Sequence, residues 1–231
     1  MAYPGVIVVT GAAGNLGSAV CSLLAARGCK VVAVYREGGR PRAPSGHAFA
    51  LEAGATDLAD PAASASVAQA AVKALGRIDG LVHTVGGFAM GSLAADGPEL
   101  LEKMWRINLV TAANMIRAVW PVMQAGGGGR IVAIGAGPAL HAGQGMAAYA
   151  GAKAALLRLI EAVAAEGRPH RIQANTVVPS TIDTPQNRAA MPDADRAKWV
   201  TAEQLGEAIA FLLSDAASGI SGAHLPVAGG S

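Results

Sequence analysis

The stretch Val6-Ile7-Val8-Val9-Thr10-Gly11-Ala12-Ala13-Gly14-Asn15-Leu16-Gly17 decides the fold of this chain. Val6–Thr10 is a run of β-branched residues and predicts a short buried strand. Three glycines spaced G-x-x-G-x-x-G follow it directly, and after them apolar residues recur at helical intervals. Strand, glycine loop and helix N-terminus form a cradle for a pyrophosphate, because backbone N–H groups and the helix dipole face the anion. The alternative for this loop alone is a tight turn that binds no ligand.

Strand and helix patterns alternate along all 231 residues, which predicts a single α/β domain with a parallel, doubly wound sheet and helices on both faces. The expected strands are Val6–Thr10, Lys30–Tyr35, Ala48–Glu52, Gly80–Thr84, Arg130–Gly135, Arg171–Val178 and Ala223–Pro226. The expected helices are Leu16–Arg27, Pro61–Ala74, Glu99–Gln124, Ala148–Glu166 and Ala202–Leu213. The polar, weakly periodic segment Pro185–Val200 is expected to form a lid over the carboxyl ends of the strands.

Composition and charge exclude several classes of function. The formal net charge is +2, so neither a nucleic acid nor a membrane surface is expected as a partner. No run of about 18 apolar residues is present to span a bilayer. Met1–Pro4 leads into the first strand without the pattern of a signal peptide, which favours a cytoplasmic protein.

The cysteines and histidines indicate no metal site. Cys21 and Cys29 are expected to be free thiols in a reducing compartment. His47, His170 and His224 are scattered, without a carboxylate or cysteine at ligand spacing.

Tyr149 and Lys153 stand four residues apart in an expected helix and therefore share one of its faces. A lysine ammonium favours the phenolate and is expected to lower the pKa of Tyr149 from its usual value of about 10. The tyrosine would then exchange a proton with a substrate near neutral pH. The alternative is a surface pair without a chemical role, and the glycine loop upstream argues against it.

In their order along the chain, these motifs resemble those of the short-chain dehydrogenase/reductase family, and the resemblance covers essentially the whole sequence. Thr10–Gly17 resembles the cofactor loop of the family, and Asp57-Leu58 resembles its acidic dipeptide beside the adenine. His83–Gly87 stands where the family usually shows Asn-Asn-Ala-Gly. Two further segments are similar to the nicotinamide-contacting segment and to the terminal signature, namely Pro179–Thr184 and Val227–Gly230.

The resemblance implies a Rossmann-type sheet of about seven strands, with a cofactor half over about residues 1–130 and a catalytic half over about 131–231. It implies that Tyr149 donates a proton, that Lys153 lowers its pKa and binds the nicotinamide ribose, and that Asn108 orders a water and a helix kink. The other implied cofactor-binding residues are Gly11, Ala13, Asn15, Leu16, Gly17, Arg36, Asp57, Leu58, Val85, Gly86, Pro179, Ile182 and Thr184.

The serine that the family places thirteen residues before the tyrosine is missing, and Ala136 stands there. No serine occurs from Leu93 through Val178. That hydroxyl normally donates to a substrate oxygen as it gains charge, and loss of such a donor costs on the order of 10²–10³ in rate. His141 and Gln144 are candidates for a substitute donor, and the alternative for each is an exposed loop residue.

The segment Pro179–Trp199 is similar to that of the quinonoid dihydropteridine reductases, a branch that also has a small residue in place of the serine. Their acceptor is electron-poor, so hydride arrives without a developing alkoxide and the missing donor is not needed. Met191 and Trp199 in this segment are expected to contact the substrate, together with Ala136.

The end of the second expected strand favours NADP(H). Tyr35 stands where an Asp or Glu would bind a ribose 2′-hydroxyl, and the guanidinium of Arg36 is suited to a 2′-phosphate. Arg40 and Arg42 add positive charge nearby. NAD(H) remains possible, because the dihydropteridine reductase branch often uses NADH.

The sequence thus predicts an NADPH-dependent reductase that transfers hydride to a C=N, quinonoid or conjugated acceptor, a small molecule, with Tyr149 as the proton donor. The alternatives are a ketone or alcohol oxidoreductase with a substitute donor, a non-catalytic dinucleotide-binding protein, and a biosynthetic enzyme that uses the scaffold for another step. The resemblance also implies a homotetramer or homodimer that packs through Glu99–Gln124 and Ala148–Glu166.

Overall fold

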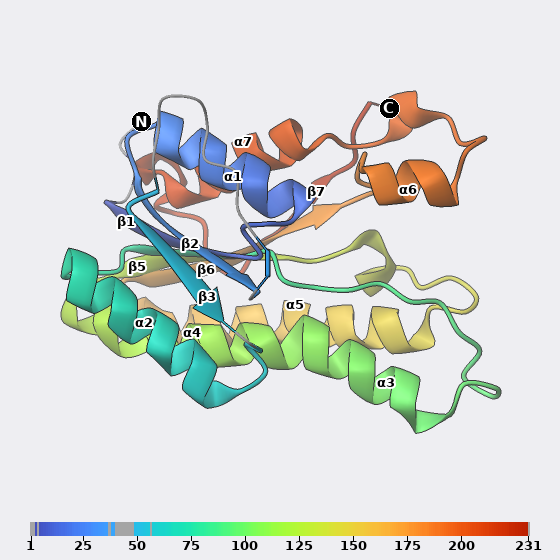
Figure 1. Cartoon of the computed structure of the whole chain (residues 1–231), viewed down its shortest axis with the longest axis horizontal. Helices are drawn as coiled ribbons and strands as arrows, with labels where there is room; N and C mark the ends of the chain where they lie inside the picture. The colour runs from blue at the N-terminus through green and yellow to red at the C-terminus, as the bar shows by residue number, and fades with distance from the viewer. Residues whose placement is uncertain (1–2, 4, 37, 40–48, 56, 231) are drawn as a thin grey trace.

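The computed structural model describes residues 3, 5–36, 38–39, 49–55 and 57–230, which form one seven-stranded parallel sheet between two layers of helices (Figure 1). The strand order is β3-β2-β1-β4-β5-β6-β7, so the direction of winding reverses between β1 and β4. A crevice for ligands forms at such a reversal in open α/β sheets. The strands are β1 (Val6–Thr10), β2 (Lys30–Arg36), β3 (Leu51–Ala55), β4 (Gly80–His83), β5 (Gly129–Ile134), β6 (Ile172–Pro179) and β7 (His224–Val227). The predicted fold class is confirmed.

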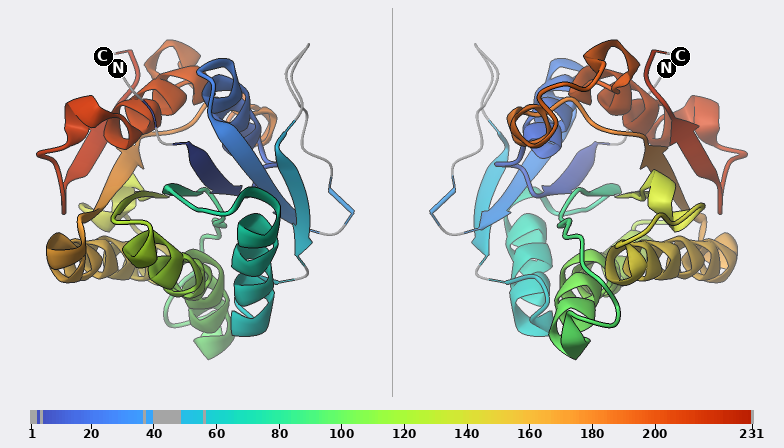
Figure 2. Two further views of the ribbon diagram at one scale, coloured as in Figure 1. Left: turned by 90° about the vertical axis from the view of Figure 1, so that its left-hand side faces the viewer. Right: turned by 90° about the vertical axis from the view of Figure 1, so that its right-hand side faces the viewer.

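Helices cover both faces of the sheet, and Figure 2 shows the layers from the two ends of the molecule. The helices are α1 (Asn15–Ala26), α2 (Pro61–Leu75), α3 (Gly97–Trp105), α4 (Thr111–Ala125), α5 (Ala147–Gly167), α6 (Pro185–Ala190) and α7 (Ala202–Leu213). Helices α1 and α7 lie on one face, and α2, α4 and α5 lie on the other (Figure 1). Both faces are therefore closed to water, as a parallel sheet requires.

The alternation of side chains along β1 supplies both cores. Val6 and Val8 belong to the core that also contains residues of α2, α4 and α5, whereas Ile7 and Val9 belong to the core with α1 and α7. All four side chains are at most 2% exposed. Full burial of such a side chain stabilises the fold by about 1.5–3 kcal/mol. This strand can therefore carry no polar side chain before its last residue, Thr10.

One strand prediction is shifted along the sequence. A strand was expected over Ala48–Glu52, but β3 runs over Leu51–Ala55, in register with Val32–Arg36 of β2. Gly54 lies inside this strand, and glycine has a low strand propensity, so pairing with β2 decides the outcome. Residue 48 lies outside the described residues.

The long helix predicted over Glu99–Gln124 is divided in the structure. Helix α3 ends at Trp105, a π-helical turn follows over Arg106–Val110, and α4 begins at Thr111. A π turn inserts one residue into the helical repeat and is common at functional sites.

The segment predicted as a lid contains a short helix. Helix α6 begins after Thr184, whose hydroxyl accepts a hydrogen bond from the backbone N–H of Asn187 at 3.1 Å. A parallel bridge between Ile182 and Val200 closes the segment at its base. The polar residues of this segment therefore belong to a loop that is held by hydrogen bonds.

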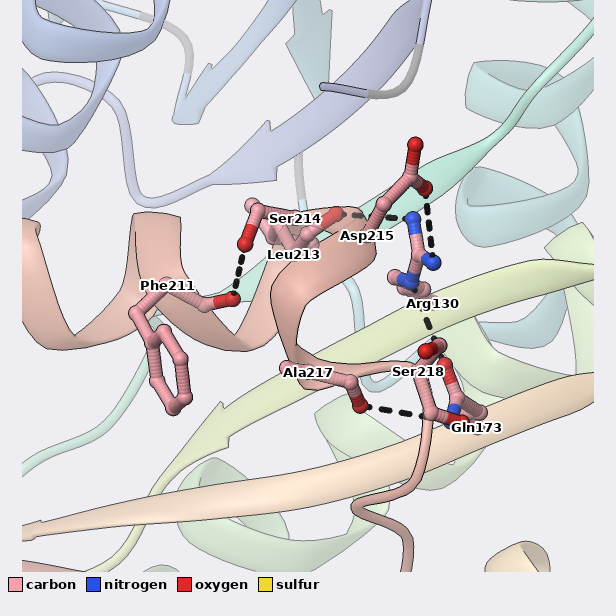
Figure 3. Close-up of polar contacts among 8 residues, drawn as sticks. All are labelled: Arg130, Gln173, Phe211, Leu213, Ser214, Asp215, Ala217 and Ser218. Carbon is pink, nitrogen blue, oxygen red and sulfur yellow. Dashed lines mark hydrogen bonds and ion pairs between the residues drawn. The ribbon is translucent and has the colours of Figure 1, made fainter. Parts of the chain in front are cut away.

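Arg130 ties the carboxyl end of α7 to the sheet (Figure 3). Its guanidinium donates hydrogen bonds to the Leu213 carbonyl at 3.0 Å, to Asp215 Oδ1 at 3.0 Å and to Gln173 Oε1 at 3.2 Å. Gln173 in turn donates to the carbonyl of Ser218. The side chain of Arg130 is only 18% exposed, so these acceptors compensate for the water that its charge has lost.

The loop between β1 and α1 depends on two glycines. Gly11 has φ +72°, in the left-handed region that favours glycine. A Cβ atom on Gly17 would lie 2.1 Å from the carbonyl oxygen of Gly11, far inside van der Waals contact. The first turn of α1 therefore packs directly on the backbone of the loop.

The variant Gly17→Ala is expected to lower the free energy of unfolding by about 1–3 kcal/mol, because the added methyl group forces the loop away from α1. Urea denaturation measures this change. Gly151→Ala is the matched control, since a Cβ atom there meets nothing within 4 Å. The control should be as stable as the wild type or more stable, and equal stability of both variants would contradict the close approach.

Candidate active site

A cleft of about 1250 Å³ lies at the carboxyl ends of the strands. The loops after β4 and β5 and helix α6 all lie at this end of the sheet (Figure 1). Pockets for drug-sized ligands measure roughly 300–1,000 Å³, so this cleft has room for a large ligand and a small one together. A smaller hollow of about 490 Å³, lined by Arg77, Asp79 and Arg130 among others, contains none of the predicted site residues.

Charged residues line part of the cleft, among them Arg36 at the end of β2 and Asp57 after β3. Asp57 accepts hydrogen bonds from the backbone N–H of Ala59 at 2.8 Å and from Arg106 Nη2 at 2.7 Å. These two bonds, with the positive charges of Arg106 and Arg36, hold the pKa of Asp57 below its usual value. Arg36 is exposed and lines the same cleft. Arg40, Arg42 and His47 lie outside the described residues.

Tyr149 and Lys153 lie on α5 and both line the cleft. Lys153 is 5% exposed, its Nζ donates to the Ile134 carbonyl at 2.7 Å, and burial lowers its pKa to about 8. Burial raises the pKa of Tyr149 to about 12. The expected pKa of Tyr149 below its usual value is therefore wrong, because loss of hydration of the phenolate raises it. Lys153 is bonded to the Ile134 carbonyl, and its role toward the phenolate stays a prediction.

Asn108 is fully buried within the π-helical turn and fixes the loop after β4. Its Oδ1 accepts from the N–H of Gly87 at 3.1 Å, and its Nδ2 donates to the carbonyls of Gly87 at 2.9 Å and Met104 at 3.1 Å. A Cβ atom on Gly86 would lie 2.9 Å from Asn108 Oδ1 and 3.3 Å from Lys153 Nζ. The helix irregularity expected at Asn108 is present as the π turn. Its role in ordering a water stays a prediction.

His83 is buried beneath the cleft between two threonines. The Thr111 hydroxyl donates to the Ile107 carbonyl at 2.7 Å, so it accepts from His83 Nε2 at 3.1 Å. His83 Nδ1 therefore carries no proton and accepts from the Thr10 hydroxyl at 2.9 Å. Burial, with a smaller contribution from Lys153, lowers the pKa of His83 to about 3. The imidazole is a neutral cross-link between β1, β4 and α4.

Ala136 lies between β5 and the 3₁₀ turn Gly137–Ala139, is 5% exposed and lines the cleft, and its side chain is a methyl group. The Phe88 ring packs against the Tyr149 ring with 4.9 Å between centroids and an interplanar angle of 87°. An edge-to-face pair of this kind restricts how the phenol can turn.

The structure brings most of the predicted site residues together. The predicted residues that line the cleft, besides Tyr149, Lys153, Asn108, Ala136 and Met191, are Gly11, Ala13, Asn15, Leu16, Gly17, Arg36, Asp57, Leu58, Val85, Gly86, Pro179, Ile182 and Thr184. Their individual roles stay predictions.

Three residues expected to contact the substrate are not among those that line the cleft. His141 and Gln144 are exposed, because the chain leaves the cleft in the 3₁₀ turn Gly137–Ala139 and lines it again only at Met146. Trp199 is 7% exposed, and its main chain lies against Gly229. The structure does not support a contact of these three side chains with substrate.

Sequence reasoning missed several residues that line the cleft. Phe88 and Met90 follow β4, and their place at the carboxyl end of a strand was a usable signal. Lys103 near the end of α3 and Arg106 at the start of the π turn also line the cleft, and no motif in the sequence singled out these two side chains.

Within the part of the chain that the structure describes, no three His, Cys, Asp or Glu side chains gather as a metal site. Among the same residues, no helix is both long and apolar enough to cross a bilayer. Cys21 and Cys29 are both buried and free.

Comparison with known proteins gives consistent matches along the chain. A family profile described as Enoyl-(Acyl carrier protein) reductase matches residues 11–231. The 3-oxoacyl-(acyl-carrier-protein) reductase FabG of Escherichia coli (strain K12) is 32% identical over 235 residues, covering 97% of this chain and 96% of that protein. An L-rhamnose 1-dehydrogenase (NAD(P)(+)) of Azotobacter vinelandii is 33% identical over 244 residues, covering 97% of this chain and 95% of that protein.

Solved structures agree with these matches. A short-chain type dehydrogenase/reductase from Mycobacterium ulcerans superposes with a TM-score of 0.89 at 25% identity, covering 99% of this chain and 90% of that one. A putative short-chain dehydrogenase/reductase from Burkholderia xenovorans superposes with a TM-score of 0.85 at 28% identity, covering 97% of this chain and 95% of that one. With the profile match and the relatives above 30% identity, these findings show that the chain belongs to the short-chain dehydrogenase/reductase family of NAD(P)H-dependent oxidoreductases.

Proposed function

We propose that the protein reduces a C=N, quinonoid or conjugated acceptor with NADPH, and that Tyr149 donates the proton. The observation that carries this proposal is the methyl group of Ala136, which lines the same cleft as Tyr149. A ketone gains a localised negative charge on oxygen as it is reduced and needs a donor there. A conjugated acceptor spreads that charge over several atoms, and an imine places no charge on an oxygen. Reduction of either acceptor therefore depends less on a hydroxyl donor at position 136 than reduction of a ketone does.

The residues of the cleft fit a dinucleotide. Gly11, Gly17 and Gly86 line the cleft and carry no side chain, so phosphates and the nicotinamide can approach the backbone closely there. When bound, the cofactor supplies the hydride. Tyr149 supplies the proton, which its raised pKa keeps on the phenol at neutral pH. We assign the binding of the carboxamide to Pro179, Ile182 and Thr184, which line the same cleft.

Arg36 supports a preference for NADP(H). It ends β2, is exposed, and lies in the cleft with no acidic residue at the preceding position, Tyr35. A guanidinium binds a phosphate with charge-assisted hydrogen bonds and gains less from a hydroxyl.

The variant Arg36→Asp is expected to raise the KM for NADPH at least tenfold and to lower the KM for NADH. The exposed Arg168 lies outside the cleft lining, and Arg168→Asp makes the same change of charge as a control. Steady-state kinetics with both cofactors measures the effect. A wild-type enzyme whose KM for NADH equals or falls below that for NADPH would rule out the preference.

A second candidate is a ketone or alcohol oxidoreductase. The relatives favour it, because one is a 3-oxoacyl-(acyl-carrier-protein) reductase and another an L-rhamnose 1-dehydrogenase. It requires another donor for the substrate oxygen. His141 and Gln144 do not line the cleft, so a water or a backbone N–H would have to act.

The test follows NADPH oxidation with a quinonoid dihydropterin and with a simple ketone, after subtraction of the rate without enzyme. Tyr149→Phe is expected to lower the rate about 10²–10⁴-fold, the usual contribution of a general acid. Ala136→Ser is expected to raise ketone reduction about tenfold or more and to leave reduction of the dihydropterin nearly unchanged.

The outcomes separate the candidates. A wild-type enzyme that prefers the ketone supports the second candidate. No turnover of either acceptor, with tight binding of NADPH, supports the non-catalytic dinucleotide-binding protein or another biosynthetic step. Equal effects of Ala136→Ser on both acceptors would contradict the role given to the missing hydroxyl.

The pKa of Lys153, near 8, predicts a loss of activity in alkaline solution. The ammonium is needed to bind the ribose and to stabilise the phenolate formed when Tyr149 donates its proton, and it is lost as the pH rises through 8. Tyr149 itself stays protonated there, because its pKa is about 12. The kcat/KM for reduction should be level below pH 7 and fall above pH 8, whereas Lys153→Met should be slow at every pH. A level profile of the wild type up to pH 9.5 would contradict this assignment.

We also propose that the protein is a homodimer or homotetramer in solution that packs through Glu99–Gln124, which spans α3 and α4, and through Ala148–Glu166 of α5. Apolar side chains exposed on α3, next to these helices, support an interface: Leu101 and Trp105 are each 46% exposed.

A further inference from the structure

Four apolar side chains line the same cleft as Tyr149, and one of them, Phe88, packs on the Tyr149 ring. Phe88 and Met90 come from the loop after β4, Met146 from the residue before α5, and Met191 from the end of α6. We call these four residues the apolar mouth. Phe88 and Met90 are each 58% exposed and Met191 is 38% exposed. Large apolar side chains left this open around a site mark a surface for a ligand.

Contacts between loops hold the apolar mouth in shape. The N–H of Gly91 donates to the Gly145 carbonyl at 2.8 Å, which joins the loop after β4 to the loop before α5. The Met90 methyl lies 3.3 Å from where a Cβ atom of Gly145 would be. The Phe88 ring rests on the Tyr149 ring in edge-to-face geometry. The mouth is therefore built around the proton donor itself.

The charges of the cleft lie elsewhere. Its charged lining residues are Arg36, Asp57, Lys103, Arg106 and Lys153. None of them is on the three segments that carry the apolar mouth, and Lys153 is turned toward the Ile134 carbonyl. The four side chains of the mouth thus offer thioethers and an aromatic ring, and none of them carries a charge to bind an acid or an O–H or N–H group to bind the hydroxyl of a sugar.

We propose that the apolar mouth binds the flat, uncharged ring of an aromatic or conjugated substrate, and that Phe88 determines this specificity. The inference rests on the proposed function, since it names the substrate class of the same site. Thioethers adapt to ring edges and make favourable contacts with them, and Phe88 adds a ring surface next to Tyr149. Polyols and sugars leave their hydroxyls without partners in such a mouth and are poor substrates.

The test compares two acceptors with the same conjugated reactive group, one with an aryl substituent and one with a methyl substituent. The wild type is expected to show a kcat/KM at least tenfold higher for the aryl acceptor. Phe88→Ala is expected to reduce that preference about tenfold, and Phe88→Leu less. Any disturbance of Tyr149 slows both acceptors alike and cancels in the ratio. Leu93→Ala is the control, because Leu93 is on the same loop, is 74% exposed and does not line the cleft.

A binding measurement separates failure of this inference from failure of the proposed function. Calorimetry with the aryl-substituted product in the presence of NADP⁺ should give a dissociation constant about tenfold weaker for Phe88→Ala than for the wild type. If neither acceptor is turned over but this difference is seen, the inference holds and the proposed reaction does not. An unchanged preference in Phe88→Ala, or a wild type that prefers the methyl acceptor or a polyol, overturns the inference.

Discussion

A parallel sheet buried on both faces leaves only the ends of its strands for polar chemistry. In β1 the side chains from Val6 to Val9 are all committed to one core or the other. The sheet therefore contributes to the cleft only through residues at or after the ends of its strands: the glycine loop after β1, Arg36 at the end of β2, Asp57 after β3 and Gly86 after β4. The cleft forms where these strand ends meet.

Burial, more than the attraction between charges, sets the protonation of the site. Loss of hydration raises the pKa of Tyr149 to about 12 and lowers that of Lys153 to about 8. It also lowers the pKa of His83 to about 3. All three shifts favour the neutral form of the group, as expected in a medium of low polarity. At neutral pH the phenol keeps its proton, the imidazole is neutral, and the ammonium is charged because its pKa still lies above the ambient value.

Much of the fold was predictable because its signals are local. The run Val6–Thr10 and the glycines after it specify a buried strand and a close turn, and the structure confirms both. The π turn at Arg106–Val110 was not predictable as such, because it is stabilised by the contact of Asn108 with Gly87, far away in sequence. Strand β3 was displaced for the same reason, since its register comes from β2.

The site was predictable to a similar extent. Tyr149, Lys153 and Asn108 follow from spacing and resemblance, and the structure places them in one cleft. The direction of the Tyr149 pKa shift was not predictable, because it depends on how deeply the folded chain buries the phenol. The absence of His141, Gln144 and Trp199 from the residues that line the cleft depends on the path of two loops, which no local pattern encodes.

The hydrogen bonds around His83 have a single direction. The Thr10 hydroxyl donates to the imidazole, the imidazole donates to Thr111, and Thr111 donates to the Ile107 carbonyl. A carbonyl oxygen accepts a hydrogen bond but has no proton to pass on. This series of hydrogen bonds therefore ends at an acceptor and cannot conduct protons from the cleft into the core. The buried imidazole ties β1, β4 and α4 together without being able to carry a proton between them.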